Sequence, residues 1–260
     1  MKSVIKVSVI MSEYNTDKTY LRTAIQSILD QTFKDFEFII VDDRGKNDLA
    51  KVVKNFNDDR IRIIKNQKNM GLVYSLNKAV RLAKGEYLVR MDTDDIALPD
   101  RIEKTYEFML AHPEYDVVGS CAVEFSGKKD LGILGKPGEK SKKSIMRGDV
   151  PVHPAVIMKK ESVVSVSNYD NYQRAEDLAL WCKLLLNKKR IFVLDDVLLL
   201  YRVNKDDYAK RTLKNRKDEL KARITFYPKM GANLVDYLYI AKSIIAGIMP
   251  VKLVQICRSR

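Results

Sequence analysis

The chain has 260 residues, of which 46% are hydrophobic, and its formal net charge at pH 7 is +13. This length suffices to bury the core of one large domain, or of a domain with an appendage, and the positive charge predicts an anionic partner such as nucleic acid, a membrane surface or a phosphorylated small molecule. Three scattered cysteines argue against a disulfide framework, and two histidines are too few for a His- or Cys-ligated zinc site.

The first half of the chain alternates between apolar runs and segments with helical spacing. The apolar runs predict strands over 4–11, 36–41, 61–64 and 88–91, and the spacing predicts helices over 21–29, 50–56, 71–83 and 99–110. Gly85 is expected to end the third helix. Strand and helix alternate four times, which predicts an α/β fold with a parallel sheet and right-handed crossovers.

The second half of the chain is less regular. Glycines at 127, 135 and 138 indicate turns or mobile loops, and a short polar helix is expected before residue 152. Further strands are predicted over 155–158, 191–194 and 197–203, and a helix over 176–186; from 206 onward the chain is predicted to be helical and strongly basic. The sequence contains neither a signal segment nor an apolar run long enough to span a bilayer, so we expect a cytoplasmic protein.

Three carboxylates follow the strand at 88–91 within four positions. Because side chains alternate along an extended chain, Asp92 and Asp94 are expected to face the same side. Two carboxylates this close raise each other's pKa unless a cation lies between them, and oxygen ligands at a strand end suit Mg²⁺ or Mn²⁺. The alternative is an acidic turn before a helix that Pro99 opens. The acidic segment alone leaves both interpretations open.

Polar residues also follow the other predicted strands of the first half. Tyr14, Asp42 and Asn69 lie at or just beyond the carboxyl ends of strands, where parallel α/β sheets bind their ligands. Asp42 could accept a hydrogen bond from a base or a ribose, or it could stabilise a tight turn. Tyr14 could stack on a base, or it could belong to a loop that caps the next helix. Neither GxGxxG nor GxxxxGK[ST] occurs, so a metal clamp is the expected device for holding phosphates.

A second acidic pair, Glu176-Asp177, opens the helix predicted over 176–186. The helix dipole favours acidic residues there, and a carboxylate at a helix start beside a metal site also suits a general base. His153 either belongs to a turn or contacts the substrate that accepts the transferred group. Arg202 is either a surface charge or a partner for pyrophosphate.

The ordered set of motifs resembles the family 2 inverting glycosyltransferases, which have a GT-A fold. The matching segments lie within residues 1–205 and are, in chain order, 7–15, 27–32, 38–43, 69–72 with Asn77, 90–95, 99–102, 117–120, 153–155, 176–177 and 201–203. The resemblance implies a Rossmann-like, mostly parallel central sheet flanked by helices. It divides the chain into a GT-A domain over 1–205, with a nucleotide-binding half (1–119) and an acceptor-side half (120–205), and a C-terminal helical extension over 206–260.

The resemblance also implies a role for each candidate residue. The residues implied for the nucleotide-sugar site are Glu13, Tyr14, Asp42, Asn69 and Asp92. Asp92-Thr93-Asp94 corresponds to the DXD motif, with Asp94 and Asp92 as ligands of Mn²⁺ or Mg²⁺, and Asp177 corresponds to the general base. The residues implied for the acceptor and diphosphate side are His153, Glu176, Trp181 and Arg202.

The reaction implied by the resemblance is transfer of one hexose or N-acetylhexosamine from a UDP-sugar to a hydroxyl of a glycan acceptor, linked to a polyprenyl diphosphate, in bacterial polysaccharide or oligosaccharide biosynthesis. A single displacement inverts the anomeric centre. The Gln-x-x-Arg-Trp signature of processive synthases is absent and Gln173-Arg174 does not replace it, which predicts a non-processive enzyme. Two departures from the family pattern, Arg44-Gly45 and Ser12-Glu13, leave the nearby nucleotide contacts open.

The segment 206–260 combines basic side chains with apolar residues near helical spacing. This pattern suits peripheral binding to the anionic inner face of the cell membrane, and the alternative is a basic helix packed on the domain or on a second subunit. Rival functions are a nucleic-acid-binding module that uses this segment and a nucleotidyltransferase. No nucleic-acid-binding motif and no triphosphate-binding loop is visible in the sequence, so no nucleic-acid partner is expected.

Overall fold

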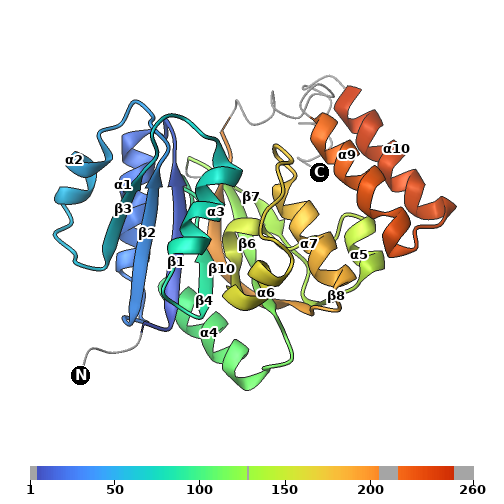
Figure 1. Cartoon of the computed structure of the whole chain (residues 1–260), viewed down its shortest axis with the longest axis horizontal. Helices are drawn as coiled ribbons and strands as arrows, with labels where there is room; N and C mark the ends of the chain where they lie inside the picture. Colours follow the sequence, from blue (N-terminus) through green and yellow to red (C-terminus); the bar gives the residue numbers. More distant parts are fainter. Residues whose placement is uncertain (1–4, 128, 205–215, 249–260) are drawn as a thin grey trace.

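The strands form a single sheet across the described part of the chain (Figure 1). The structure is a computed structural model and describes residues 5–127, 129–204 and 216–248. The order within the sheet is β3-β2-β1-β4-β9-β6-β10-β5, with β7 paired to β6 and β8 paired to β10. The strands are β1 (Val7–Glu13), β2 (Phe36–Asp42), β3 (Ile61–Lys65), β4 (Tyr87–Arg90), β5 (Ile96–Ala97), β6 (Val117–Ser126), β7 (Lys129–Leu134), β8 (Gly138–Lys140), β9 (Val156–Lys159) and β10 (Ile191–Arg202).

The first four strands are parallel to one another, as their alternation with helices predicted. β1 pairs in parallel with both β2 and β4, and β2 pairs in parallel with β3. β9 lies antiparallel between β4 and β6, whereas β6 and β10 are parallel to each other. The result is a continuous mixed sheet, parallel over its first four strands, that joins the two halves of the chain.

Helices cover both faces of the sheet because consecutive strand residues point to opposite faces and nearly all of them are apolar. In β1, Ile10 belongs to the buried cluster that contains α3, whereas Val9 and Met11 belong to the cluster that contains α1 and α4. The helices are α1 (Lys18–Leu29), α2 (Leu49–Lys54), α3 (Leu72–Leu82), α4 (Arg101–Ala111), α5 (Lys142–Met146), η1 (His153–Ala155), α6 (Lys160–Ser165), α7 (Glu176–Leu186), α9 (Lys217–Phe226), η3 (Pro228–Met230) and α10 (Leu234–Ile248).

The expected role of Gly85 as the end of a helix is wrong. α3 ends at Leu82, and Ala83 already has an extended conformation. A Cβ atom at position 85 would lie 2.7 Å from the backbone nitrogen of Ser8. Gly85 therefore permits the close approach of this loop to β1, which no larger residue allows.

One expectation for the second half of the sheet is also wrong. The strands predicted over 191–194 and 197–203 form one strand, β10, whose pairing with β6 is irregular between Leu194 and Leu199. Between the turns expected around Gly127 and Gly135, the structure has the strand β7, and β8 begins at Gly138. These two strands pair antiparallel with β6 and β10, so this segment extends the sheet.

The C-terminal helices α9 and α10 lie beside α7 and α5, at the end of the molecule opposite α2 and β3 (Figure 1). Ala222, Phe226, Tyr227, Met230 and Ile240 belong to the same buried cluster as the apolar face of α7. The described part of the basic extension thus packs on the domain, and residues 206–215 and 249–260 of it lie outside the described residues. Over the ranges that the structure covers, none of the helices combines the length and the apolar character needed to cross a bilayer.

Candidate active site

Glu13 and Asp42 end two neighbouring parallel strands. They are partners in the register of β1 and β2, so both lie at the carboxyl edge of the sheet. Glu13 is buried, and its Oε1 accepts hydrogen bonds from Thr16 N (3.1 Å) and Asn47 Nδ2 (2.8 Å). Burial raises the pKa of Glu13, and the charge of Asp42 adds to the effect. Glu13 therefore holds the loop after β1, whereas the adjacent Tyr14 is half exposed.

Asp43 anchors the segment before α3, a role that the sequence did not predict. Its Oδ1 accepts hydrogen bonds from Asn66 Nδ2 (2.7 Å) and Met70 N (2.8 Å), and its Oδ2 accepts one from Gly71 N (2.9 Å). These bonds anchor the segment before α3, in which Asn69 is exposed. The signal in the sequence was the second carboxylate at the end of β2, which is suited to the amide groups at a helix start.

Alternate residues of the acidic loop after β4 face opposite directions, as the extended pattern predicted. Asp92 and Asp94 are partly exposed, whereas Thr93 and Asp95 are buried. Thr93 Oγ1 lies 2.6 Å from Thr16 Oγ1. This contact ties the acidic loop to the loop after β1, so both loops meet at the same edge of the sheet.

Asp95 and Arg202 join the acidic loop to the end of β10. Asp95 Oδ1 accepts a hydrogen bond from Arg202 N (2.8 Å), and Arg202 Nε donates one to the carbonyl oxygen of Asp94 (2.7 Å). The guanidinium also lies 4.0 Å from the ring centre of Tyr20 and 4.5 Å from that of Phe125. Burial raises the pKa of Asp95 well above its ordinary value, and the neighbouring carboxylates add to this shift. Arg202 thus fixes the backbone that carries Asp94, and its contact with a diphosphate stays a prediction.

Glu176 and Asp177 form the first turn of α7, where the sequence placed them. Glu176 is buried, and burial together with the charge of Asp177 raises the pKa of Glu176 to about 7. Burial also raises the pKa of Asp177, and this shift is opposed by the hydrogen bond that Asp177 Oδ1 accepts from Leu178 N (2.7 Å). A carboxylate with a raised pKa is a stronger base, which suits it to take a proton from a hydroxyl group.

His153 lies between Tyr169 and Trp181. Its Nε2 is 2.9 Å from the Tyr169 hydroxyl, and its ring stands edge-on to the indole of Trp181, with 5.9 Å between the ring centres. Burial lowers the pKa of His153 well below its ordinary value, so the imidazole is neutral at pH 7. Trp181 has no exposed surface, so it supports His153 from within the core and does not itself face an acceptor.

Arg90 is a buried cation that the sequence analysis did not select. Its Nη1 forms an ion pair with Asp92 Oδ1 at 2.5 Å. Its charge also opposes the rise that burial causes in the pKa values of Glu176 and Asp177. The sequence did contain a sign of this role, since Arg90 is a charged residue within an apolar strand. A buried charge requires a partner of opposite sign, which here is the nearby carboxylate.

The donor atoms of the acidic loop fit a divalent cation that is shared with a bound diphosphate. Asp92 and Asp94 are both partly exposed and offer hard oxygen ligands of the kind that Mg²⁺ and Mn²⁺ bind. In the described part of the chain, no three His, Cys, Asp or Glu side chains are grouped as a complete metal site. The remaining ligands of such a cation would therefore come from the diphosphate and from water.

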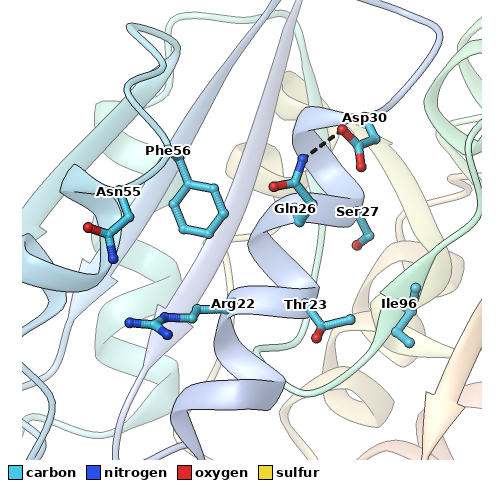
Figure 2. A pocket seen from close by; sticks show the side chains of 8 residues that line it. All are labelled: Arg22, Thr23, Gln26, Ser27, Asp30, Asn55, Phe56 and Ile96. Carbon is cyan, nitrogen blue, oxygen red and sulfur yellow. Dashed lines mark hydrogen bonds between the residues drawn. The ribbon is translucent and has the colours of Figure 1, made fainter.

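A groove beside α1 does not involve any of the residues predicted for the site (Figure 2). Its lining comes from α1, the segment after α2, and β5, and consists of Arg22, Thr23, Gln26, Ser27, Asp30, Asn55, Phe56 and Ile96. Within it, Gln26 Nε2 donates a hydrogen bond to Asp30 Oδ1 (2.7 Å). The candidate site is thus defined by the loops at the carboxyl edge of the sheet, and this groove is separate from it.

Solved structures of glycosyltransferases share this architecture. S. aureus TarS 1–349 in complex with UDP-GlcNAc superposes with a TM-score of 0.73 at 20% identity, over 94% of this chain and 71% of that chain. The mannosyltransferase PcManGT from Pyrobaculum calidifontis, in complex with GDP-Man and Mn²⁺, has a TM-score of 0.70 at 15% identity, over 98% and 80%. The fold is therefore that of the GT-A glycosyltransferases.

Sequence comparison then defines the family. The family model described as Glycosyl transferase family 2 matches residues 8–153. The UDP-Gal:alpha-D-GlcNAc-diphosphoundecaprenol beta-1,3-galactosyltransferase of Escherichia coli is 32% identical over 89% of this chain and 86% of its own length. The amylovoran biosynthesis glycosyltransferase AmsE of Erwinia amylovora is 30% identical over 95% and 96%, respectively. The chain belongs to glycosyltransferase family 2.

Proposed function

We propose that this enzyme is a metal-dependent, inverting and non-processive glycosyltransferase that moves one hexose or N-acetylhexosamine from a UDP-sugar to a hydroxyl of a lipid-linked glycan acceptor. The observation that carries the proposal is the position of Arg90, which pairs with Asp92 of the acidic loop and acts on the carboxylates that open α7. Asp92 and the carboxylates at the start of α7 thus interact electrostatically with the same buried cation. The Escherichia coli relative named for UDP-Gal and a diphosphoundecaprenol acceptor supports the donor and acceptor classes.

The residues suggest a single displacement. Asp177 would remove the proton of the acceptor hydroxyl as its oxygen attacks the anomeric carbon, and the bond to the departing UDP breaks on the opposite side, which inverts the configuration. Glu176, whose pKa is about 7, would share with Asp177 the proton that is taken from the acceptor hydroxyl. A divalent cation held by Asp94 and Asp92 would supply neutralisation of the charge on the leaving diphosphate. Asp95 and Arg202 would keep the backbone of these ligands in place.

The Asp94→Asn variant tests the metal and the nucleotide together. Calorimetric titration with UDP in the presence of Mn²⁺ should show metal-dependent binding to the wild-type protein and a loss of at least about tenfold in affinity in the variant, because a charged oxygen ligand of the cation is removed. GDP serves as the control nucleotide, since a structural neighbour is in complex with GDP-Man. Binding of UDP that is indifferent both to Mn²⁺ and to the substitution would contradict this assignment.

The exposed side chains of α10 suit a membrane surface, where a lipid-linked acceptor would be found. Leu234 and Leu238 lie four residues apart, on one side of the helix, and are 87% and 66% exposed, whereas Ile240 is buried against the domain. Lys217, Lys221 and Lys229 are exposed on the same C-terminal unit. Exposed apolar side chains and exposed cations on one unit are the combination that binds to the interface of an anionic bilayer.

Replacing both Leu234 and Leu238 by glutamate should weaken binding to phosphatidylglycerol vesicles by roughly tenfold or more, because apolar area is lost and negative charge is added. Vesicle flotation measures the effect. Ile133→Glu, at an equally exposed apolar residue of β7, is the matched control and should leave flotation unchanged. Equal flotation of the double variant and the wild-type protein would exclude this face as the membrane contact.

A further inference from the structure

The segment 166–175 connects α6 to α7 and leads directly into the acidic first turn of α7. It runs between α3 and α9 and has hydrogen bonds to both (Figure 1). Three of its residues, Ser167, Asn168 and Arg174, have φ angles of 63°, 58° and 62°, respectively. Residues other than glycine rarely adopt this left-handed conformation. Contacts with other elements must therefore stabilise the course of the segment.

The contact from α3 is made by the side chain of Asn77, which holds both polar backbone groups of Tyr169. Asn77 Nδ2 donates a hydrogen bond to the Tyr169 carbonyl oxygen (2.9 Å), and Asn77 Oδ1 accepts one from Tyr169 N (3.0 Å). The carboxamide of asparagine carries its donor and its acceptor side by side. The two bonds therefore fix the orientation of Tyr169 as well as its position.

Tyr169 passes this restraint on to His153. Its hydroxyl lies 2.9 Å from His153 Nε2, and 5.5 Å separates the centres of the two rings. Both side chains are buried, so neither can move far without displacing closely packed neighbours. Asn77, Tyr169 and His153 thus form a continuous series of hydrogen-bonded contacts from α3 to η1.

We propose that Asn77 is a positioning residue for the acceptor side of the reaction: it fixes the backbone of Tyr169, and the Tyr169 hydroxyl in turn fixes the imidazole of His153. This inference rests on the proposed function and deepens it, because His153 is one of the residues that the family resemblance implies for the acceptor side. Asn77 acts through Tyr169 and not on the nucleotide. A substitution at Asn77 should therefore impair use of the acceptor and leave binding of UDP unchanged.

The first measurement is nuclear magnetic resonance of the histidine side chains in the full chain, whose only histidines are His112 and His153. Tyr169→Phe removes only the hydroxyl, so it gives the signal of His153 without this partner. Asn77→Ala should move the His153 signal in the same direction, because Tyr169 is released. The His112 signal should not move, because this side chain follows α4, is 46% exposed and lies outside these contacts.

The second measurement is kcat/KM for a synthetic lipid diphosphate that carries one N-acetylhexosamine, with a panel of UDP-sugars as donors. Asn77→Ala and Tyr169→Phe should each lower kcat/KM by about tenfold, the usual effect of losing one buried hydrogen bond. Because Asn77 acts through Tyr169, the double variant should lose little more than either single variant. Independent effects would instead multiply to about a hundredfold. Calorimetry should show unchanged binding of UDP with Mn²⁺ in all three variants.

Asn187→Ala is the matched control. Asn187 Nδ2 also donates a hydrogen bond to a backbone carbonyl, that of Lys183 (2.9 Å), but Asn187 is exposed at the far end of α7. This variant should change neither the His153 signal nor kcat/KM. If Asn77→Ala does not fold, Asn77→Asp takes its place, because aspartate has nearly the same size, keeps Oδ1 and puts an oxygen that repels the Tyr169 carbonyl in place of the donor.

An unchanged His153 signal in Asn77→Ala, or in Asn77→Asp where that variant replaces it, would overturn the inference. Weaker binding of UDP, or effects that multiply in the double variant, would also overturn it, because Asn77 would then merely support the fold. Absence of sugar transfer by the wild-type protein would instead overturn the proposed function, whereas the histidine signals would still test the link from Asn77 to His153. The two failures are therefore distinguishable.

Discussion

Replacing Asp177 by asparagine should reduce sugar transfer by about 10²–10⁴-fold, which is the usual contribution of a general base. The amide has nearly the same shape but cannot take the proton of the acceptor hydroxyl. Binding of UDP should be unchanged, because Asp177, in the first turn of α7, is proposed to act on the acceptor and not on the nucleotide. The measurement is kcat with a panel of UDP-sugars, together with calorimetry of UDP.

Two controls separate a lost base from a damaged fold. Asp195→Asn makes the same change at an exposed carboxylate of β10 and should leave kcat unchanged. Because burial raises the pKa of Asp177 in the folded protein, its ionisation opposes folding above its unfolded pKa. Asp177→Asn should therefore be no less stable than the wild-type protein at pH 8. A variant that retains more than about a third of the wild-type kcat would remove Asp177 from the mechanism.

Replacing Phe226 by alanine should lower the free energy of unfolding by about 3–5 kcal/mol, the usual cost of removing a buried aromatic side chain. Phe226 packs from α9 into the cluster that includes α7, and its ring centre lies 6.0 Å from that of Tyr172. Urea unfolding measures the effect. The same helix supplies Asp218, whose Oδ2 accepts a hydrogen bond from Gln173 N (2.8 Å) just before α7, so sugar transfer should decline as well.

Ile224→Ala is the matched control on the same helix, because Ile224 is 65% exposed. Its effect on the free energy of unfolding should stay within about 0.5 kcal/mol. If Ile224→Ala and Phe226→Ala had equal effects, α9 would not be packed on the domain. Because Ile240 of α10 lies in the same buried cluster as Phe226, membrane contacts are better removed by substituting exposed side chains than by deleting either helix.

The features that the sequence predicted well depend on local pattern. A strand that ends in alternating carboxylates exposes Asp92 and Asp94 together, whatever surrounds it. The alternation of strands and helices predicted the parallel sheet and hence a common edge for the loops. The start of α7 at Glu176 followed from apolar spacing and from the acidic residues of its first turn.

The features that the sequence did not reveal depend on contacts between distant segments. Trp181 lies on the apolar face of α7, but spacing alone does not distinguish a face toward the core from a face toward an acceptor. Asp43 looked like part of a turn because its partners at Asn66, Met70 and Gly71 come from another loop. The single strand β10 looked like two because its irregular pairing with β6 interrupts the alternation of side chains.

The antiparallel strand β9 has a consequence for how such an enzyme can diversify. It is hydrogen-bonded to β4 on one side and to β6 on the other, so backbone bonds join the first four strands to the rest of the sheet. A ladder of this kind acts as a fixed spacer between the strand that leads into Asp92 and the strands beyond it. The loops at the edge of the sheet can therefore change in length and composition between related enzymes. Such changes would alter which sugar or acceptor is selected, whereas the distance between the strands that carry the reacting groups would stay the same.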